Sequence, residues 1–404
     1  MERLIAEAQT LVGTFDKPRY VDYNQSLCAH NRNNKPGCTR CLDLCPAGAI
    51  SPAGEHVAID AAICAGCGSC AAACPTGAVT YALPPASAVL RRIRTMLMAY
   101  RDAGGPDPIL LLHDETHGQA LIDACARSGR GLPGNVLPLR LNEVTRSELA
   151  LIAGSLAYGV DSLVFLLPHR PKHDPEGLRR TLALADAIRS GRCTLLETDD
   201  PDALSALRSV GNAVATPSRF LPIGEGRELT VAALKELHRV APLDDTVLPA
   251  AAPFGAITVN AEGCTLCHAC VAACPTGALR ADDNKPMLFF AESACVQCGL
   301  CRATCPEKVI ALLPRLNPQA WSAAPVVMKE EEPFPCIKCG KPFGTRSSIE
   351  RVSAKLADRH WMFSGENARR LDVLKMCDTC RVEAVVNEGF DPHSAPPRPP
   401  VRLD

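Results

Sequence analysis

The residues most able to take part in chemistry are the 22 cysteines, of which sixteen stand in four short runs. Each run ends in Cys-Pro, and in three of them two, two and three residues separate the successive cysteines. The remaining run keeps its last two gaps but has nine residues in the first. The runs are Cys28, Cys38, Cys41, Cys45; Cys64, Cys67, Cys70, Cys74; Cys264, Cys267, Cys270, Cys274; and Cys295, Cys298, Cys301, Cys305.

This spacing is suited to iron–sulfur clusters. A cubane cluster needs four thiolates; three closely spaced cysteines on one loop can hold three of its irons, and the fourth ligand must come from elsewhere. Cysteine pairs two residues apart also bind zinc, but a zinc site has no use for the third cysteine or the proline. We therefore expect 4Fe-4S clusters, with zinc as the alternative.

The spacing and the trailing proline resemble those of the two-cluster bacterial ferredoxins. The resemblance implies the ferredoxin fold, one-electron transfer, and a fourth cysteine that ligates the other cluster of its pair. Small residues beside the ligands, such as Gly66, Gly68 and Gly299, fit a backbone that approaches the sulfides closely. The implied ligands are Cys28, Cys38, Cys41 and Cys74 for cluster one; Cys64, Cys67, Cys70 and Cys45 for cluster two; Cys264, Cys267, Cys270 and Cys305 for cluster three; and Cys295, Cys298, Cys301 and Cys274 for cluster four.

The wide gap of the first run leaves one ligand open. Residues 29–36 are inserted there and bring His30 near the ligand position of Cys28. A histidine ligand would raise the reduction potential of cluster one. Cys28 is the favoured ligand, since a histidine in a polar loop is ordinary. The insertion could also serve as a docking surface.

A fifth metal site is predicted near the carboxyl end. Cys336 and Cys339 form one pair and Cys377 and Cys380 another, with 37 residues between the pairs. Two hairpin knuckles of this kind make a tetrahedral four-sulfur site, which most often holds structural zinc. A single rubredoxin-like iron is the alternative, whereas a fifth cubane lacks its three-cysteine loop.

The elements around these runs indicate repeated units. A strand-like segment precedes three of the runs, and another follows each proline, which gives a unit of strand, cluster loop, short helix and strand. Paired units predict one ferredoxin-like module at 20–84 and another at 253–315. A four-cysteine segment at 330–385 follows, and a proline-rich, disordered tail is expected at 392–404.

Between the modules, residues 105–245 are expected to form an α/β domain. Candidate strands at 109–113, 136–141, 162–167 and 194–197 alternate with helical spacing, which predicts a small flavodoxin-like open parallel sheet. No glycine-rich nucleotide loop follows any of these strands. Polar residues after two strands, His113, Asp114 and His117 among them, are read as ordinary loop polarity. Cys125 and Cys193 receive no role.

Two weaker resemblances concern partners. Residues 109–171 resemble the delta-type iron–sulfur subunit of methyl-viologen-reducing hydrogenases, at the level of the fold. The whole arrangement resembles 4Fe-4S accessory proteins of molybdenum or tungsten formate dehydrogenases. Both imply docking to a larger redox enzyme.

Composition and charge limit the partners and the cellular location that we expect. The formal net charge is -1, so no global field favours nucleic acid or an anionic membrane. The first residues lack the apolar core of a signal peptide, and dense cysteine in the reducing cytoplasm indicates metal ligation rather than disulfides. We expect a cytoplasmic protein without direct membrane insertion.

The sequence thus indicates an electron-transfer protein or subunit that relays single low-potential electrons and has no evident catalytic centre. The alternatives are an oxidoreductase subunit whose middle domain binds a flavin or substrate, and a maturation or docking factor for a molybdoenzyme.

Overall fold

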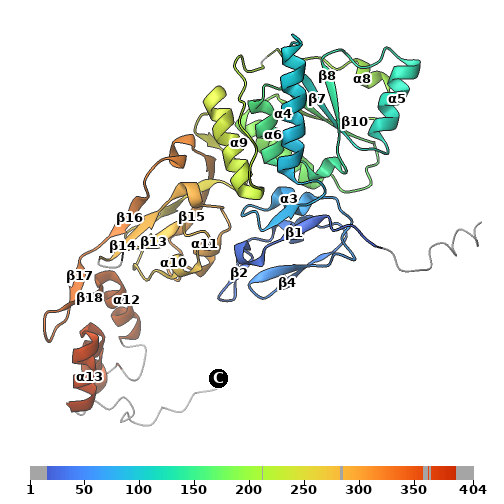
Figure 1. Cartoon of the computed structure of the whole chain (residues 1–404). Coiled ribbons are helices and arrows are strands. Elements are labelled where there is room, and N and C mark those ends of the chain that lie inside the picture. Colours follow the sequence, from blue (N-terminus) through green and yellow to red (C-terminus); the bar gives the residue numbers. More distant parts are fainter. Residues whose placement is uncertain (1–15, 212, 283–284, 358–362, 364, 388–404) are drawn as a thin grey trace, which may run out of the picture. The chain divides into compact units, whose positions relative to one another are not determined.

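The computed structural model describes residues 16–211, 213–282, 285–357, 363 and 365–387 (Figure 1). The chain divides into two compact units. The first unit contains the residues up to 255 together with the short segments 296–298 and 314–318, and the second contains the rest. No helix in the described ranges is long and apolar enough to cross a membrane.

The first unit begins with a small module that carries the first two cysteine runs. Its strands β1 and β6 pair antiparallel, with Val21 opposite Tyr81, and Val57 and Cys70 are buried in its core. A five-residue helix and then a strand follow the cluster loops, as the repeat predicts. The elements are β1 (Val21–Tyr23), η1 (Gln25–Leu27), β2 (Asn31–Arg32), β3 (Lys35–Pro36), α2 (Arg40–Leu44), β4 (Ile50–Ala53), β5 (His56–Ile59), α3 (Ser69–Ala73) and β6 (Val79–Tyr81).

The residues inserted in the first cysteine run form a small β-hairpin, β2–β3. Asn33 and Asn34 at its tip take positive φ angles of 51° and 58°, as a tight turn between antiparallel strands requires. Arg32 Nη1 lies 3.2 Å from Glu55 Oε2. The insertion is therefore an ordered hairpin tied to the turn between β4 and β5.

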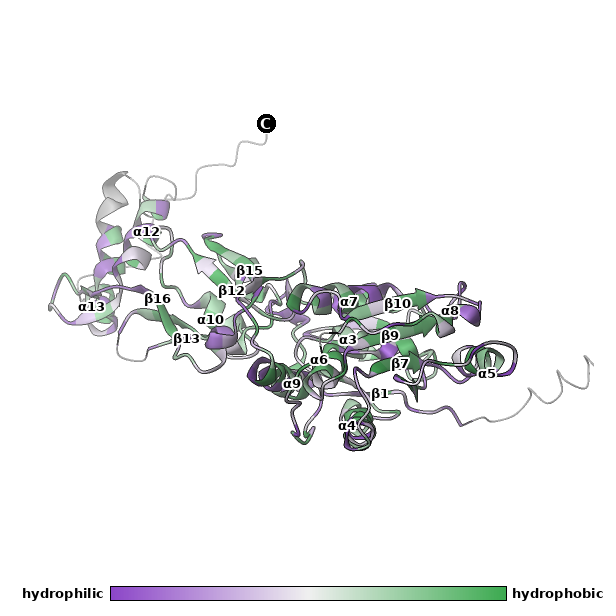
Figure 2. Cartoon of the chain, turned by 90° about the horizontal axis from the view of Figure 1, so that it is seen from above, coloured by the Kyte–Doolittle hydropathy of each residue, from purple (hydrophilic) through white to green (hydrophobic). Residues whose placement is uncertain are grey.

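The middle of the first unit is a four-stranded parallel sheet with the strand order β10-β9-β7-β8. The predictions for β7 and β9 are confirmed at both ends, and β8 and β10 differ from theirs by one residue. Every residue of β7 and β9 is buried, and both are largely apolar (Figure 2), because helices cover both faces of such sheets. The strands are β7 (Ile109–His113), β8 (Val136–Arg140), β9 (Ser162–Leu167) and β10 (Cys193–Glu197).

Helices lie on both faces of this sheet (Figure 1). On one face α5 and α8 pack together, and Cys125 of α5 is a fully buried, small core residue there. On the other face α6 packs against α7, and α4 and α9 pack on α6. All nine residues of α6 are buried, which is typical of a helix that is apolar on every side. The helices are α4 (Ala86–Asp102), α5 (Gly118–Ser128), η2 (Val144–Arg146), α6 (Leu149–Ala157), α7 (Glu176–Ile188), α8 (Asp202–Ser205) and α9 (Gly226–Val240).

Helix α4 lies outside the expected middle domain, since it ends before residue 105, yet it packs against α6. Five of its apolar side chains, Val89, Leu90, Ile93, Leu97 and Ala86, are almost completely buried. The α/β part of the unit therefore includes a helix that the alternating pattern did not indicate.

The second unit carries the last two cysteine runs. Strands β13, β14 and β16 form an antiparallel sheet, β12 pairs with β15, and the short helices α10 and α11 pack together. Leu288 and Phe290 of β14 are buried in its core. The elements are β12 (Gly255–Val259), α10 (Ala269–Ala273), β13 (Leu279–Ala281), β14 (Met287–Phe290), η3 (Glu292–Ala294), α11 (Leu300–Thr304), β15 (Ile310–Leu316), η4 (Pro318–Trp321) and β16 (Val326–Glu330); β11 (Thr246–Val247) belongs to the first unit.

The four-cysteine segment follows in the second unit. Strands β17 (Pro333–Pro335) and β18 (Pro342–Thr345) form a hairpin, followed by α12 (Arg346–Leu356), η6 (Gly365–Lys375) and α13 (Asp378–Asn387). Two hairpin knuckles were expected, but the second cysteine pair lies at the start of α13, where Asp378 in the first turn favours a helix. The tail predicted at 392–404 lies outside the described residues.

Candidate iron–sulfur sites and a four-cysteine centre

Three of the cysteine loops share one backbone shape. In each, the residue before the second cysteine and the residue after it take positive φ angles. A left-handed conformation costs a non-glycine residue about 1–2 kcal/mol, so surroundings that tolerate it must fix the loop. The loops keep this shape even at Leu266, His268 and Gln297, which are not glycine. The positions are Gly66 and Gly68, Leu266 and His268, and Gln297 and Gly299.

The four cysteines expected for cluster one surround a single cavity of about 350 Å³. Cys28, Cys38 and Cys41 come from the first run, and Cys74 comes from the end of α3 in the second run. Val57 and Val79 supply apolar wall. The fold thus brings the fourth cysteine of one run to the first three of the other.

His30 does not line this cavity, although it is close in sequence. Its ring Nδ1 lies 3.1 Å from the carbonyl oxygen of Cys38, and the residue is buried. The backbone N–H of Cys38 donates to the carbonyl of Ala29 at 2.9 Å. Cys28, not His30, therefore lines this cavity.

The set expected for cluster two lines a second cavity of about 380 Å³. Cys64, Cys67 and Cys70 come from the second run, and Cys45 arrives from the first. Val21 and Ile50 complete the apolar wall. The two runs of the first module therefore exchange their fourth cysteines in both directions.

The second unit repeats part of this arrangement. Cys264, Cys267, Cys270 and Cys305 line a cavity of about 370 Å³. From the set expected for cluster four, Cys295 is buried in the core of the second unit, and Cys274 and Cys301 pack against that core. Cys298 falls in the segment 296–298, which groups with the first unit.

Burial makes several of the cysteines around these cavities poor thiolates unless a metal binds them. Burial raises the pKa of the Cys41 and Cys270 thiols to about 12, and it also raises the pKa of Cys38, Cys67 and Cys70. Iron would remove these protons, because a coordinating thiol is deprotonated outright. Four thiols around an apolar cavity are the donor set of a 4Fe-4S cluster.

The middle domain covers the cluster-two loop through η2, a contact that the sequence analysis missed. Thr145 Oγ1 donates a hydrogen bond of 2.7 Å to the carbonyl of Cys67. A Cβ on Gly68 would lie 2.5 Å from Cβ of Arg146. The Arg146 guanidinium is buried and lies 4.3 Å from the centre of the Tyr81 ring, whose hydroxyl donates to the carbonyl of Gly66. In the sequence, η2 is only a polar stretch between a strand and an apolar helix, and such a stretch does not indicate which part of the chain it contacts.

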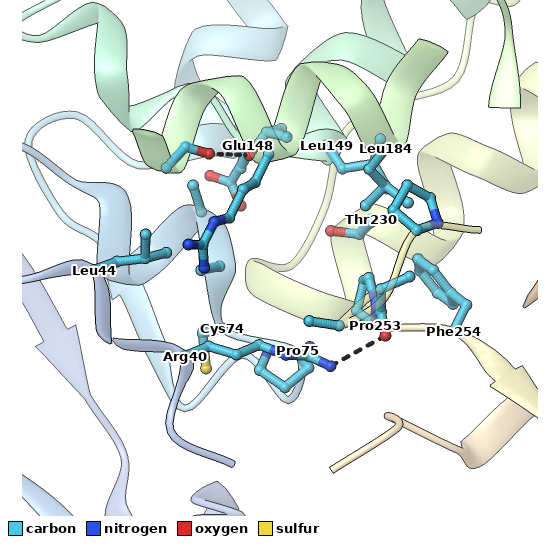
Figure 3. Close-up of a pocket in the computed structure, with 18 of the residues that line it drawn as sticks. Arg40, Leu44, Cys74, Pro75, Glu148, Leu149, Leu184, Thr230, Pro253 and Phe254 are labelled. Carbon is cyan, nitrogen blue, oxygen red and sulfur yellow. Dashed lines mark hydrogen bonds between the residues drawn. The ribbon is translucent and has the colours of Figure 1, made fainter. Parts of the chain in front are cut away.

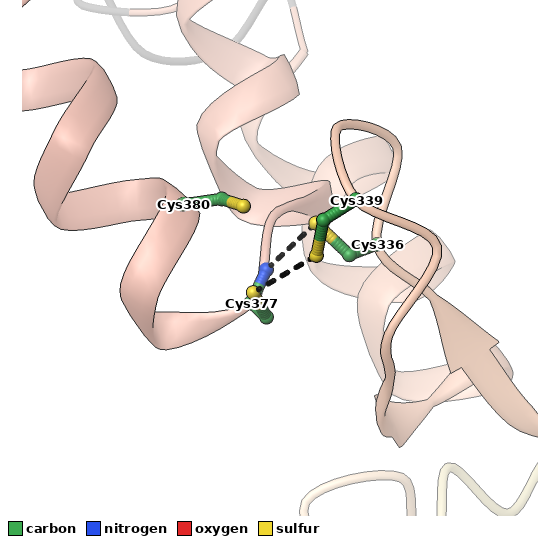
Figure 4. Close-up of side chains that lie close together, drawn as sticks. All are labelled: Cys336, Cys339, Cys377 and Cys380. Carbon is green, nitrogen blue, oxygen red and sulfur yellow. Dashed lines mark hydrogen bonds between the residues drawn. The ribbon is translucent and has the colours of Figure 1, made fainter.

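The four carboxyl-terminal cysteines converge on one point. Their sulfur atoms all lie within 4.8 Å of one another. Cys336 and Cys339 come from the β17–β18 loop, Cys377 precedes α13, and Cys380 extends from α13 toward the others (Figure 4). Such a group can bind a metal ion.

Backbone donors around Cys336 favour its thiolate. Burial alone would raise its pKa, but hydrogen bonds from the backbone N–H groups of Cys339, Cys377 and Lys338 lower the pKa to about 6. The N–H of Cys377 lies 3.3 Å from Cys336 Sγ. These hydrogen bonds to its sulfur stabilise the thiolate, which is the form that binds a metal cation.

This four-cysteine segment is anchored to the cluster-three loop within the second unit. Thr345 Oγ1 donates to the carbonyl of Thr265 at 2.9 Å. Arg351 and Lys355 of α12 pair with Glu307 at 2.8 and 3.0 Å, and Glu307 lines the cluster-three cavity. The segment thus supports one wall of that cavity.

The polar residues after β7 have local roles. Asp114 Oδ1 accepts from the N–H groups of His117 and Gly118 at 2.8 and 2.7 Å and so orders the start of α5. His113 is buried, with Nδ1 2.8 Å from the carbonyl of Asp114. His117 Nε2 lies 3.1 Å from Asp199 Oδ1. These local contacts explain the polar residues after β7 without a bound ligand.

Comparison with known proteins supports iron–sulfur clusters at the level of domains. One family model described as a 4Fe-4S dicluster domain matches residues 11–78, and another with the same description matches residues 263–310. No curated protein matches the chain. The chain therefore contains two 4Fe-4S dicluster domains of the ferredoxin type.

Proposed function

We propose that this chain relays single low-potential electrons through four 4Fe-4S clusters, to or from a larger redox enzyme. The observation that carries the proposal is the exchange of fourth cysteines: Cys74 lines the cavity of the first run, and Cys45 lines that of the second. The proposed ligands are Cys28, Cys38, Cys41 and Cys74; Cys64, Cys67, Cys70 and Cys45; Cys264, Cys267, Cys270 and Cys305; and Cys295, Cys298, Cys301 and Cys274.

A bound 4Fe-4S cluster would supply one-electron redox chemistry. The chain's residues would hold the cluster, exclude water and adjust its potential. Cys28, Cys67 and Cys70 are all buried, so their thiolates would be shielded from solvent. The backbone N–H of Val79 lies 3.4 Å from Cys74 Sγ, and a hydrogen bond to a ligating sulfur favours the reduced cluster.

The proposed role of the middle domain is scaffolding and partner docking. Read in chain order, its sheet has the order two, one, three, four, which is that of a flavodoxin-like sheet without its fifth strand. This order agrees with the resemblance to the hydrogenase delta subunit. A formate dehydrogenase is the partner that the resemblance of the whole arrangement favours.

A pulldown of the chain from anaerobically grown cells tests the partner. We expect a larger redox enzyme to co-purify in fixed stoichiometry and to exchange electrons with the reduced chain. Association only with an immature enzyme that lacks its metal cofactor would instead support a maturation factor.

We further propose that the four-cysteine centre holds structural zinc, with a single rubredoxin-like iron as the alternative. The ligand type and the closed geometry support zinc, since Cys₄ sites of this kind are mostly structural. Metal analysis after purification should find about one zinc per chain. An iron content that exceeds the labile sulfide content by one atom per chain, with no zinc, would favour the alternative.

Electron relay itself is tested by reductive titration. The visible absorption of the anaerobic chain should bleach with dithionite and return on addition of an oxidised viologen. A chain that holds its iron but takes up no electrons would contradict the proposed function.

A further inference from the structure

A pocket in the first unit has no part in the roles described so far. It lies between α3 of the ferredoxin module and α6, α7 and α9 of the middle domain, and residues 249–254 close one side. Glu148 and Leu149 at the start of α6 face Cys74 and Pro75 across it (Figure 3). Helix α6 follows the carboxyl end of β8, and open α/β sheets bind ligands near such ends.

This pocket shares a wall with the cavity proposed for cluster one. Arg40, Cys74 and Pro75 line both spaces. A molecule in the pocket would be separated from the cluster by little more than the Cys74 ligand and Pro75. The rate of electron transfer falls steeply with distance. The shared wall therefore makes the pocket a suitable position for a redox partner of cluster one.

The walls favour a largely apolar molecule. Ala71, Ala72 and Ala73 of α3 line it with small side chains, and Leu149 and Leu184 add larger apolar side chains. Small-molecule sites are mostly apolar with a few placed polar groups, and the lining of this pocket has that composition.

The polar groups add positive charge. Arg40, Arg180 and Arg227 line the pocket, against a single carboxyl group, that of Glu148. Arg227 Nη1 donates to the carbonyl of Pro253 at 2.8 Å, and Arg40 Nη2 donates to that of Ala252 at 3.1 Å, so both hold the 249–254 wall. The side chain of Arg180 is 55% exposed and pairs with Glu176. An exposed arginine on the lining is suited to a negatively charged substituent.

We propose that this pocket binds a planar redox-active molecule, a conjugated ring with carbonyl groups and an anionic substituent, that exchanges electrons with cluster one. The inference rests on the proposed function, because cluster one is the electron donor. Reduction of the ring to its dihydro form takes two electrons and two protons. Two successive one-electron transfers from reduced cluster one supply the electrons, and water supplies the protons.

Equilibrium dialysis of the anaerobic, iron-loaded full chain tests this proposal. The probes are FMN and anthraquinone-2-sulfonate, which share the ring chemistry and an anionic group, and riboflavin, which has the FMN ring without the phosphate. We expect one site for at least one anionic probe, and at least tenfold weaker binding of riboflavin if FMN is that probe. FMN alone would identify a flavin, and the sulfonate alone a quinone.

Two pairs of variants locate the site. Thr230→Phe fills the pocket from α9 and should weaken binding at least tenfold, whereas Lys235→Phe adds the same ring to the exposed side of that helix. Arg180→Gln should weaken the anionic probe severalfold, while Arg179→Gln, whose side chain pairs with Glu197 outside the pocket, should not.

Iron content separates the two possible failures. Absence of binding by both anionic probes in a chain with full iron would overturn the pocket proposal and leave the electron-relay function standing, as would binding that Thr230→Phe leaves unchanged. A chain that cannot hold clusters would instead overturn the proposed function.

Discussion

The hydroxyl of Thr145 donates a hydrogen bond of 2.7 Å to the carbonyl of Cys67. Thr145 belongs to η2 of the middle domain, whereas Cys67 stands at the centre of the cluster-two loop. Both residues are buried. The loop that would hold cluster two is therefore completed by a residue far along the chain, and the middle domain contributes to the surroundings of that cluster.

Thr145→Val should weaken the hold on cluster two. Valine preserves the shape but leaves the Cys67 carbonyl without this donor, and an unsatisfied buried acceptor costs about 1–3 kcal/mol. We expect lower thermal stability and faster loss of iron to a chelator. Thr95→Val is the control, because Thr95 is exposed and donates within its own helix. Equal behaviour of the two variants would contradict the role of this contact.

Gly68→Ala tests how closely η2 approaches the loop. The new Cβ would lie 2.5 Å from Cβ of Arg146, so one of the two elements must move, at a cost of roughly 1–3 kcal/mol. Gly54→Ala is a matched control, since Gly54 has a similar φ of +70° with nothing within 4 Å. Cluster loading and unfolding should change more for Gly68→Ala than for Gly54→Ala. Equal losses would show that backbone strain alone explains the effect.

Glu148→Gln should remove a pH dependence of stability. Burial raises the pKa of Glu148 to about 7, although Arg146 opposes the shift. A carboxyl whose pKa is raised on folding stabilises the fold at low pH, and that contribution is lost as pH rises from about 4.5 to about 7. By pH 8 the wild type should have lost up to roughly 3 kcal/mol relative to the glutamine variant.

Thermal unfolding of both proteins at pH 5 and pH 8 measures this difference. Glu115→Gln is the control, because the Glu115 side chain is 75% exposed. Parallel changes in the wild type and Glu148→Gln would show that Glu148 does not titrate on folding.

Double variants test the crossed ligand map. If Cys45 serves the same cluster as Cys64, Cys45→Ala combined with Cys64→Ala should remove one cube, up to about four irons. Cys45→Ala combined with Cys38→Ala should remove two cubes, up to about eight irons. The reverse result would assign Cys45 to the cluster of its own run. Iron analysis with electron paramagnetic resonance of the reduced chain distinguishes the two outcomes.

The cysteine sets were predictable because local spacing shapes each cluster loop. Cys64, Cys67 and Cys70 form one loop wherever the chain takes this turn, and the exchange of Cys45 and Cys74 follows from pairing two such loops. Strands β7 and β9 were predictable for a similar reason, since each is a short continuous apolar run bounded by polar residues.

The contacts between the module and the middle domain could not be predicted in this way. Thr145 meets Cys67, and Gly177 lies so near Ser69 that an added Cβ would be 2.8 Å from the serine Cβ. Partners this far apart in sequence leave no local pattern. Helix α4 was missed because it lies between the ferredoxin module and β7, the first strand of the parallel sheet, and so comes before the alternation that marked the other helices.

The most direct test of four clusters is the labile sulfide content of the anaerobically purified chain. Sulfide counts cubanes alone, because neither zinc nor a rubredoxin-like iron contributes any. Four cubes require about sixteen sulfides per chain, with about sixteen irons in the clusters. A value near eight in a fully loaded preparation would contradict the account, because half of the cysteine sets would then hold no cluster.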